Sequence, residues 1–238
     1  MNLSELKKQY SVVIVGSGLA GLYGALNFPE DIDVLMLSKK ERHQSNSSLA
    51  QGGVACVLDL ENDSYELHIE DTLIAGSREN DIDAVTQLIE EGPGDVLRTI
   101  DYGVEYDRDE KGELIKTLEG GHCRRRILHH KDTSGKEMVD KLVLAVEKLP
   151  NVTLADETMV TSMSRIKNGF KIEIMSGNEY KTIYADFVLL ASGGIGRVYK
   201  YTTNPSVATG DGIRLAYEMG ASIKNLSMCS STQPHLTV

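Results

Sequence analysis

Apolar and polar positions follow one another in blocks that predict an α/β fold. Four consecutive apolar residues, Val12–Val15, have the length of a buried parallel strand. A glycine-rich turn and a helical segment follow, and residues 33–37 form a second apolar run. A strand, a helix and a strand within about thirty residues are typical of a parallel β-α-β unit.

Further along the chain, helical periodicity replaces the short apolar runs. Amphipathic helices are predicted over residues 63–75, 81–102 and 136–149, each starting near an acidic or hydroxyl cap candidate. Gly92-Pro93-Gly94 lies inside the second of these helices, and we expect it to kink or split the helix because proline removes a helical hydrogen bond.

The last third of the pattern predicts strands. A short strand is expected at residues 151–155. Residues 158–184 alternate in three runs separated by turns that contain glycine and asparagine, which predicts an antiparallel meander. A final parallel strand is expected at residues 186–191, so that the meander would be inserted before it.

The turn after the first strand has the spacing G-x-G-x-x-G at Gly16, Gly18 and Gly21. In this motif the first glycine permits the tight turn, the second lets a pyrophosphate approach the backbone, and the third lets the helix pack closely on the sheet. The helix N-terminus then faces the phosphates with free N–H groups. With a strand on each side, the motif predicts a dinucleotide site.

One element of a simple NAD site is absent. The acid expected about 20 residues on, where it would bind the ribose, is replaced by Ser38-Lys39. A hydroxyl suits a ribose and an ammonium group suits a phosphate. We therefore still predict a dinucleotide ligand, but not a simple NAD site.

Composition restricts the class of protein. The 238 residues allow one large domain or two small ones, and 41% hydrophobic residues suffice for a core. A formal charge of −10 argues against nucleic acid or an anionic membrane surface as partner. Three dispersed cysteines without a C-x-x-C spacing argue against a disulfide framework or a zinc site. Together with the lack of a long apolar run or a signal sequence, they predict a cytoplasmic protein.

Three other segments are candidates for function. Residues 49–55 contain paired glycines, which suit either close approach to a flat or charged ligand or an ordinary turn. Residues 118–130 concentrate three arginines and three histidines in an acidic chain, and we favour a functional role over a solvated surface. Asp211 could cap the helix that follows it or accept hydrogen bonds from the polyol chain of a cofactor.

Taken together, these motifs resemble the succinate dehydrogenase and fumarate reductase flavoprotein superfamily, and most closely the L-aspartate oxidases. The resemblance extends over residues 11–226. It rests on the glycine turn and on four further motifs, which are LAQGGV at 49–54, EGGHCRRRIL at 119–128, ASGG at 191–194 and the TTNP and TGDG stretches within 201–212. It implies a Rossmann-like FAD-binding domain, with a parallel sheet, helices and an inserted antiparallel β-meander.

The resemblance also assigns roles to residues. It predicts FAD contacts at Gly16, Ser17, Gly18, Leu19, Ala20, Gly21, Lys39, Asn46, Ser47, Ser48, Leu49, Ala50, Gln51, Gly52, Gly53 and Asp211. Lys39 matches the lysine that the family has after the second strand. Membrane-bound succinate dehydrogenases have a histidine that tethers FAD at about the position of Asn46, so we expect non-covalent FAD here.

Glu119 is the predicted substrate-binding residue. Relatives that act on succinate or fumarate typically have a neutral glutamine there, whereas a carboxylate can pair with the ammonium group of aspartate. The resemblance therefore implies oxidation of L-aspartate to iminoaspartate, the first step of quinolinate and NAD synthesis, with oxygen or fumarate as the electron acceptor and quinolinate synthase as a candidate downstream partner.

The end of the chain departs from the family pattern. We expect residues 1–226 to form the first segment of the FAD-binding domain, with the capping and C-terminal helical domains absent. Residues 227–238 are expected to be an aberrant tail, for which a shift of reading frame is a hypothesis, and His235 is given no role. The resemblance places the arginine that donates or accepts the proton outside the chain, so no catalytic residue is assigned. We expect weak FAD binding and little or no turnover from the chain alone.

Two alternatives remain open from the sequence. A fumarate or succinate oxidoreductase belongs to the same class, and Glu119 argues against it. A flavin-binding module without catalysis is the second alternative, and loss of the cap would favour it. An inactive product is a further possibility.

Overall fold

The computed structural model describes residues 2–225. The predicted tail, residues 227–238, lies outside the described residues, as does the reading-frame hypothesis that concerns it. The helices are α1 (Leu19–Leu26), α2 (Tyr65–Ala75), α3 (Ile82–Asp101), α4 (Ser134–Val146) and α5 (Asp211–Glu218). Single 3₁₀ turns cover Leu3–Glu5, Ser47–Leu49 and Gly196–Val198.

A six-stranded mixed sheet organises the molecule, with the strand order β6-β2-β1-β9-β8-β7. β6, β2, β1 and β9 run parallel to one another. β9 also pairs antiparallel with β8, and β8 pairs antiparallel with β7. Their bounds are β1 (Gln9–Val15), β2 (Val34–Leu37), β6 (Val152–Ala155), β7 (Met159–Ile166), β8 (Gly169–Ser176) and β9 (Glu179–Leu190). The expected α/β fold with a parallel sheet and an antiparallel meander is confirmed.

The meander differs from the prediction in one respect. Its third strand and the last parallel strand were expected to be separate, but β9 is one continuous strand of 12 residues. The first half of β9 pairs with β8 and its second half pairs with β1, with Val13 opposite Val188. Because no turn residue interrupts residues 179–190, the backbone passes from the antiparallel part of the sheet to the parallel part.

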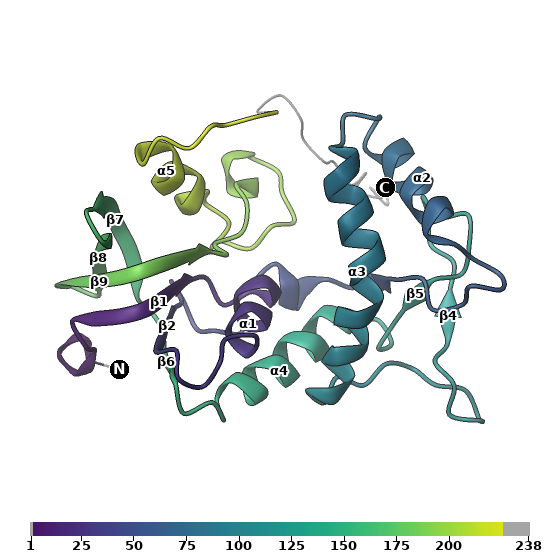
Figure 1. Cartoon of the computed structure of the whole chain (residues 1–238), viewed down its shortest axis with the longest axis horizontal. Helices are drawn as coiled ribbons and strands as arrows, with labels where there is room; N and C mark the ends of the chain where they lie inside the picture. The colour runs from purple at the N-terminus through teal and green to yellow at the C-terminus, as the bar shows by residue number, and fades with distance from the viewer. Residues whose placement is uncertain (1, 226–238) are drawn as a thin grey trace.

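Both faces of the parallel strands are buried, and successive residues alternate between two apolar clusters. Val12 and Ile14 of β1 pack against α1 and α4, where Leu22 and Leu142 are almost fully buried. Val13 belongs to the opposite cluster, with residues of the meander and α5. Figure 1 shows α5 on one side of β9, with α1 and α4 on the other side of the sheet.

Between β2 and α4 the chain leaves the sheet for about a hundred residues and forms a second region. A small antiparallel sheet has the order β3-β5-β4, with β3 at Val54–Ala55, β4 at Lys116–Thr117 and β5 at Ile127–Leu128. Figure 1 shows α2 and α3 beside this sheet, away from β7–β9.

The predicted split of α3 is wrong. The helix runs through Pro93 from Ile82 to Asp101 without a break. Val85, Ile89 and Val96 on the same helix are buried. Packing of this face outweighs the loss of the one hydrogen bond that proline cannot donate.

Candidate functional site

A cavity of about 300 Å³ lies at the carboxyl ends of the parallel strands β1, β2 and β9. This edge is where open α/β sheets bind ligands. The walls come from segments that are far apart in the sequence. They include Gly16–Ala20, Ser38–Lys40, Gln44–Ser47, Ser192–Gly194 and Asp211.

Two glycines of the predicted fingerprint are required by the backbone. Gly16 has a φ of +115°, and a Cβ there would lie 2.3 Å from the carbonyl oxygen of Ala191. A Cβ on Gly21 would lie 2.0 Å from the carbonyl oxygen of Gly16. The turn out of β1 and the close start of α1 therefore both depend on glycine.

Gly18 leaves the N-terminus of α1 open. It is the N-cap residue and makes no side-chain cap. The hydroxyl of Ser47 accepts from the Leu19 N–H at 3.2 Å, and a Cβ on Gly18 would meet that hydroxyl at the same distance. Beside it, the Ser17 and Ser38 hydroxyls share a buried hydrogen bond of 2.8 Å. A helix N-terminus with a glycine as its N-cap and small hydroxyls beside it, opening into a cavity, suits a pyrophosphate.

Lys39 and Asp211, both predicted FAD contacts, line the cavity and form an ion pair with each other. The Lys39 ammonium is 2.5 Å from Asp211 Oδ2 and also donates to Thr209 Oγ1 at 2.6 Å. Burial by itself would raise the pKa of Asp211, but the hydrogen bonds from Lys39 and Thr209 hold it below its ordinary value. Asp211 is the first residue of α5, and the N-cap is Gly210.

The predicted flavin-lining segment, residues 46–53, divides into two parts. Asn46 and Ser47 line the cavity, and the Asn46 amide donates to Asn204 Oδ1 at 2.7 Å. Ser48, Leu49, Ala50, Gln51, Gly52 and Gly53 lie outside its lining, and their flavin contacts stay a prediction. Gly53 has a different requirement, because a Cβ there would lie 2.2 Å from the carbonyl oxygen of Leu128 in β5.

Glu119 comes from another part of the chain and lies beside Gly53, the last residue of this segment. Its Oε1 is 3.1 Å from His129 Nε2 and accepts from the Gly53 N–H at 3.4 Å. The side chain of Glu119 is 39% exposed. Within the residues that the structure describes, Oε2 makes no hydrogen bond, and a Cβ on Gly52 would lie 3.6 Å from it. Residues 47–53 thus connect the α1 N-terminus, which Ser47 contacts, to a half-exposed carboxylate, which Gly53 contacts.

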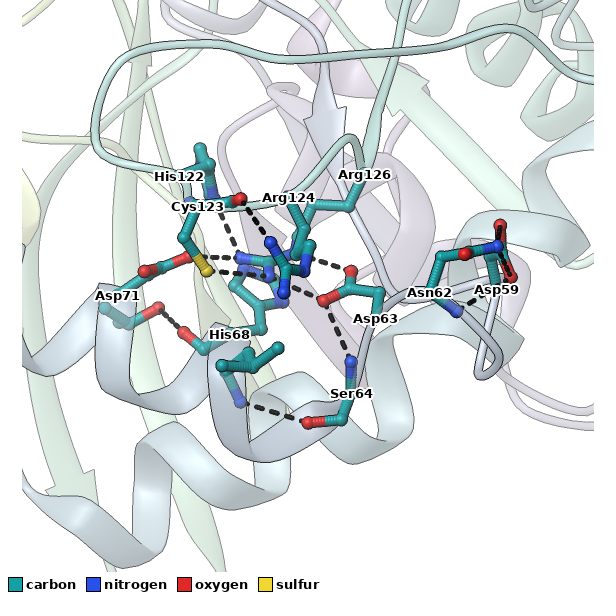
Figure 2. A network of polar contacts seen from close by, with 12 residues as sticks. Asp59, Asn62, Asp63, Ser64, His68, Asp71, His122, Cys123, Arg124 and Arg126 are labelled. Atoms are coloured by element: carbon teal, nitrogen blue, oxygen red, sulfur yellow. Dashed lines mark hydrogen bonds and ion pairs between the residues drawn. The ribbon is translucent and has the colours of Figure 1, made fainter.

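The basic cluster of residues 118–130 was expected to provide positive charge for a ligand, and Arg126 contradicts this in part. Figure 2 shows its guanidinium between Asp63 and Asp71. Its side chain is fully buried. Burial would lower the pKa of Arg126, but the two carboxylates raise it above the ordinary value. Its charge is therefore neutralised within the fold, whereas Arg124 and Arg125 are exposed.

His68 lies beside this network, and it makes stability depend on pH. Burial, followed by the positive charge of Arg126, lowers its pKa from 6.5 to about 4. Between these two values the unfolded chain binds more protons than the folded one. Stability is therefore fully present above pH 6.5 and decreases as the pH falls toward 4, by about 3 kcal/mol at most.

We expect His68→Leu to remove this part of the pH dependence. The Nδ1 atom of His68 is buried without a hydrogen-bond partner, so the variant loses no bond there. The measurement is urea unfolding of both proteins at about pH 7 and about pH 5, where the wild-type difference should exceed that of the variant. Equal differences would mean that His68 is not the group responsible. Asp63 and Asp71, whose pKa values lie below 3.8, act only at lower pH.

Comparison with known proteins agrees with the fold and the cavity. The model of the FAD binding domain family matches residues 11–234. The chain is 41% identical to L-aspartate oxidase of Clostridium perfringens over 223 residues, which cover 93% of this chain and 50% of that protein. It is 40% identical to L-aspartate oxidase 1 of Ralstonia nicotianae, covering 91% of this chain and 43% of that protein.

Among solved structures, a mutant of E. coli quinol fumarate reductase FrdA superposes with a TM-score of 0.84 at 28% identity, covering 88% of this chain and 37% of that one. A flavocytochrome c3 fumarate reductase gives 0.81 at 26% identity, covering 92% and 42%. The chain spans about half the length or less of the curated relatives that it matches.

The chain belongs to the FAD-binding domain family of flavoproteins. The expected resemblance to L-aspartate oxidases is confirmed, and so is FAD as the cofactor of the family. The residues present fit a dinucleotide, because the N-cap of α1 is a glycine without a side chain and leaves room that a Cβ would fill. Within residues 2–225, no helix is both long enough and apolar enough to span a bilayer.

The predicted site residues did not include every part of the cavity wall. Gln44, Ser45 and the segment Ser192–Gly194 line the cavity as well. Ser192–Gly194 directly follows a parallel strand, and the rule that ligands bind at the carboxyl ends of such strands could have identified it. Gln44 and Ser45 lie in a polar loop, and no local pattern marks them.

Proposed function

We propose that the chain is the dinucleotide-binding part of an enzyme that oxidises L-aspartate to iminoaspartate with non-covalently bound FAD. The observation that carries the proposal is the position of Glu119. Its carboxylate is half-exposed, with Oε1 held by His129 and Gly53 and Oε2 free of hydrogen bonds within residues 2–225. An unpaired carboxylate oxygen suits the ammonium group of an amino acid, which succinate and fumarate lack.

The residues of the chain have separate roles in this mechanism. The N-terminus of α1 would hold the pyrophosphate, with Ser17 and Ser47 beside it. Lys39 and Asp211 would contact other polar parts of the cofactor. Glu119 would orient the substrate through its ammonium group. When bound, FAD would supply the acceptor for the hydride that leaves the Cα of aspartate.

The remaining parts of the proposal concern the surroundings of the reaction. Oxygen or fumarate would take the electrons onward, and quinolinate synthase would consume the iminoaspartate. A cytoplasmic location is supported by free thiols at Cys56 and Cys123. Residues 1–226 would be the first segment of the FAD-binding domain.

Glu119→Gln tests the proposal. Loss of one charge-assisted contact to a half-exposed group should weaken the response to L-aspartate about tenfold, at the lower end of the range for hydrogen bonds to charged groups. The response to succinate should remain unchanged or increase. The measurement is the anaerobic visible spectrum of the FAD-loaded protein during titration with each dicarboxylate, followed as bleaching or a shift of the flavin band.

Glu110→Gln is the matched control, because Glu110 is an exposed glutamate in the turn before β4. It should leave both titrations as in the wild type. Equal responses to succinate and aspartate in the wild type would instead support the fumarate or succinate reading. Bound FAD without any response to either would support a non-catalytic flavin-binding module.

A further inference from the structure

The loop that carries Glu119 has little packing of its own. This segment, residues 118–125, connects β4 to β5 and is called the Glu119 loop below. A Cβ on Gly120 or Gly121 would meet nothing within 4 Å, and Gly121 has a φ of +85°. Inside the loop, the His122 N–H donates to the carbonyl oxygen of Glu119 at 3.3 Å. The tip is therefore not ordered by side chains packed against it.

Order at the base of the loop comes from a buried ion-pair network. Arg126 Nε and Nη2 donate to the two oxygens of Asp63 at 2.8 and 2.7 Å, and Nη1 donates to Asp71 Oδ2 at 2.6 Å. The same Asp71 oxygen accepts the backbone N–H of Cys123 at 2.9 Å. Figure 2 shows Cys123 of the loop above Asp71, with the Arg126 guanidinium between Asp71 and Asp63.

The network joins the loop to a rigid element. Asp63 directly precedes Ser64, the N-cap of α2, and Asp71 lies within that helix. Two carboxylates on one guanidinium, all shielded from water, form hydrogen bonds that are stronger than exposed ones. Arg126 directly precedes β5, and His129, which contacts the Glu119 carboxylate, directly follows that strand.

We propose that Arg126 is a positioning residue, which fixes the Glu119 loop to α2 through Asp63 and Asp71 and thereby holds the Glu119 carboxylate against His129 and Gly53. The functional part of this inference rests on the proposed role of Glu119 in binding the substrate ammonium group. Arg126 itself touches neither the cavity nor Glu119. Its effect on substrate selection is indirect.

Asp71→Ala tests this with a protein that can fold. Replacing Arg126 itself would leave Asp63 buried without its partner, whereas Asp71→Ala keeps the Arg126–Asp63 pair and removes the carboxylate that accepts from both Arg126 and the Cys123 N–H. Glu70→Ala is the matched control, because Glu70 is the neighbouring acid on α2 but is half-exposed and pairs with Arg78.

The first readout is amide hydrogen exchange at Gly53, whose N–H donates to Glu119 and which contacts neither Asp71 nor Arg126. We expect about tenfold faster exchange in Asp71→Ala, and no change in Glu70→Ala or at the amides around Gly16. An unchanged Gly53 rate in Asp71→Ala would overturn the proposal, whatever reaction the protein catalyses.

The second readout is the ratio of the apparent affinities for L-aspartate and succinate. It should fall in Asp71→Ala toward its value in Glu119→Gln, while FAD affinity stays the same. A variant that is only less stable would keep the wild-type ratio, and that result, with faster Gly53 exchange, would also overturn the positioning role. If the wild type itself shows no preference for aspartate, the proposed function fails, and Gly53 exchange still decides whether the network holds Glu119.

Discussion

Replacing Arg126 with alanine is expected to lower the free energy of unfolding by about 3–5 kcal/mol, because removing one member of a buried ion pair leaves the other charge unpaired. Asp63 has only 4% of its side chain exposed and accepts two hydrogen bonds from Arg126. Without Arg126, its carboxylate would lie in the interior with only the Ser64 N–H as a partner. Chemical denaturation of the wild type and the variant at neutral pH measures the difference.

The same arginine run supplies the control. Arg125→Ala changes an exposed residue one position away, and it should alter the free energy of unfolding by no more than about 0.5 kcal/mol. Similar losses in the two variants would contradict the structural role of Arg126. A triple variant with Arg126, Asp63 and Asp71 replaced by apolar residues of similar volume should recover much of the loss, since removing all three charges leaves none unpaired.

The second large effect is expected at the turn after β1. Gly16→Ala should abolish or severely weaken FAD binding, because a Cβ would lie 2.3 Å from the carbonyl oxygen of Ala191 and the residue has a φ of +115°. Overpacking costs about 1–3 kcal/mol, and a left-handed backbone adds about 1–2 kcal/mol. Relief of the clash would move β1 away from β9, at the place where Ala191 N donates to Val15 O.

Titration of the protein with FAD, followed by flavin fluorescence, measures this loss. Gly112→Ala is the control, since Gly112 has a φ of +85° but nothing within 4 Å of a Cβ. It also has a left-handed backbone but no clash, and it does not line the cavity. If Gly16→Ala bound FAD as tightly as Gly112→Ala does, the cavity beside Gly16 would not be the cofactor site.

Local patterns were sufficient for the elements that frame the cavity. The apolar run of β1, the glycine spacing and the apolar run of β2 are contiguous, and each depends on residues within a few positions of one another. The strand-turn-helix geometry follows from this because Gly16 and Gly21 allow contacts that no other residue permits. Lys39 and Asp211 were identified through resemblance, and both line the cavity.

Long-range contacts decided the rest. Arg126 and its partners are 63 and 55 positions apart, so a local reading found only a basic cluster and favoured a functional role for its positive charge. For the same reason, Gly53 was interpreted as a ligand contact, although its requirement comes from Leu128 in another strand. In β9, the change of partner from β8 to β1 leaves no trace in the alternation of residues.

The sequence by itself determined the dinucleotide turn, the class of fold and the family, because these depend on short contiguous motifs. The glycines in the turn are required because a Cβ would clash with the neighbouring backbone. Only the tertiary structure decided which charges face the solvent and which are neutralised. Burial brings Asp63 and Asp71 to Arg126 and leaves Glu119 half-exposed beside His129. The electrostatic character of each group depends on its neighbours in space, and the order of residues along the chain does not specify them.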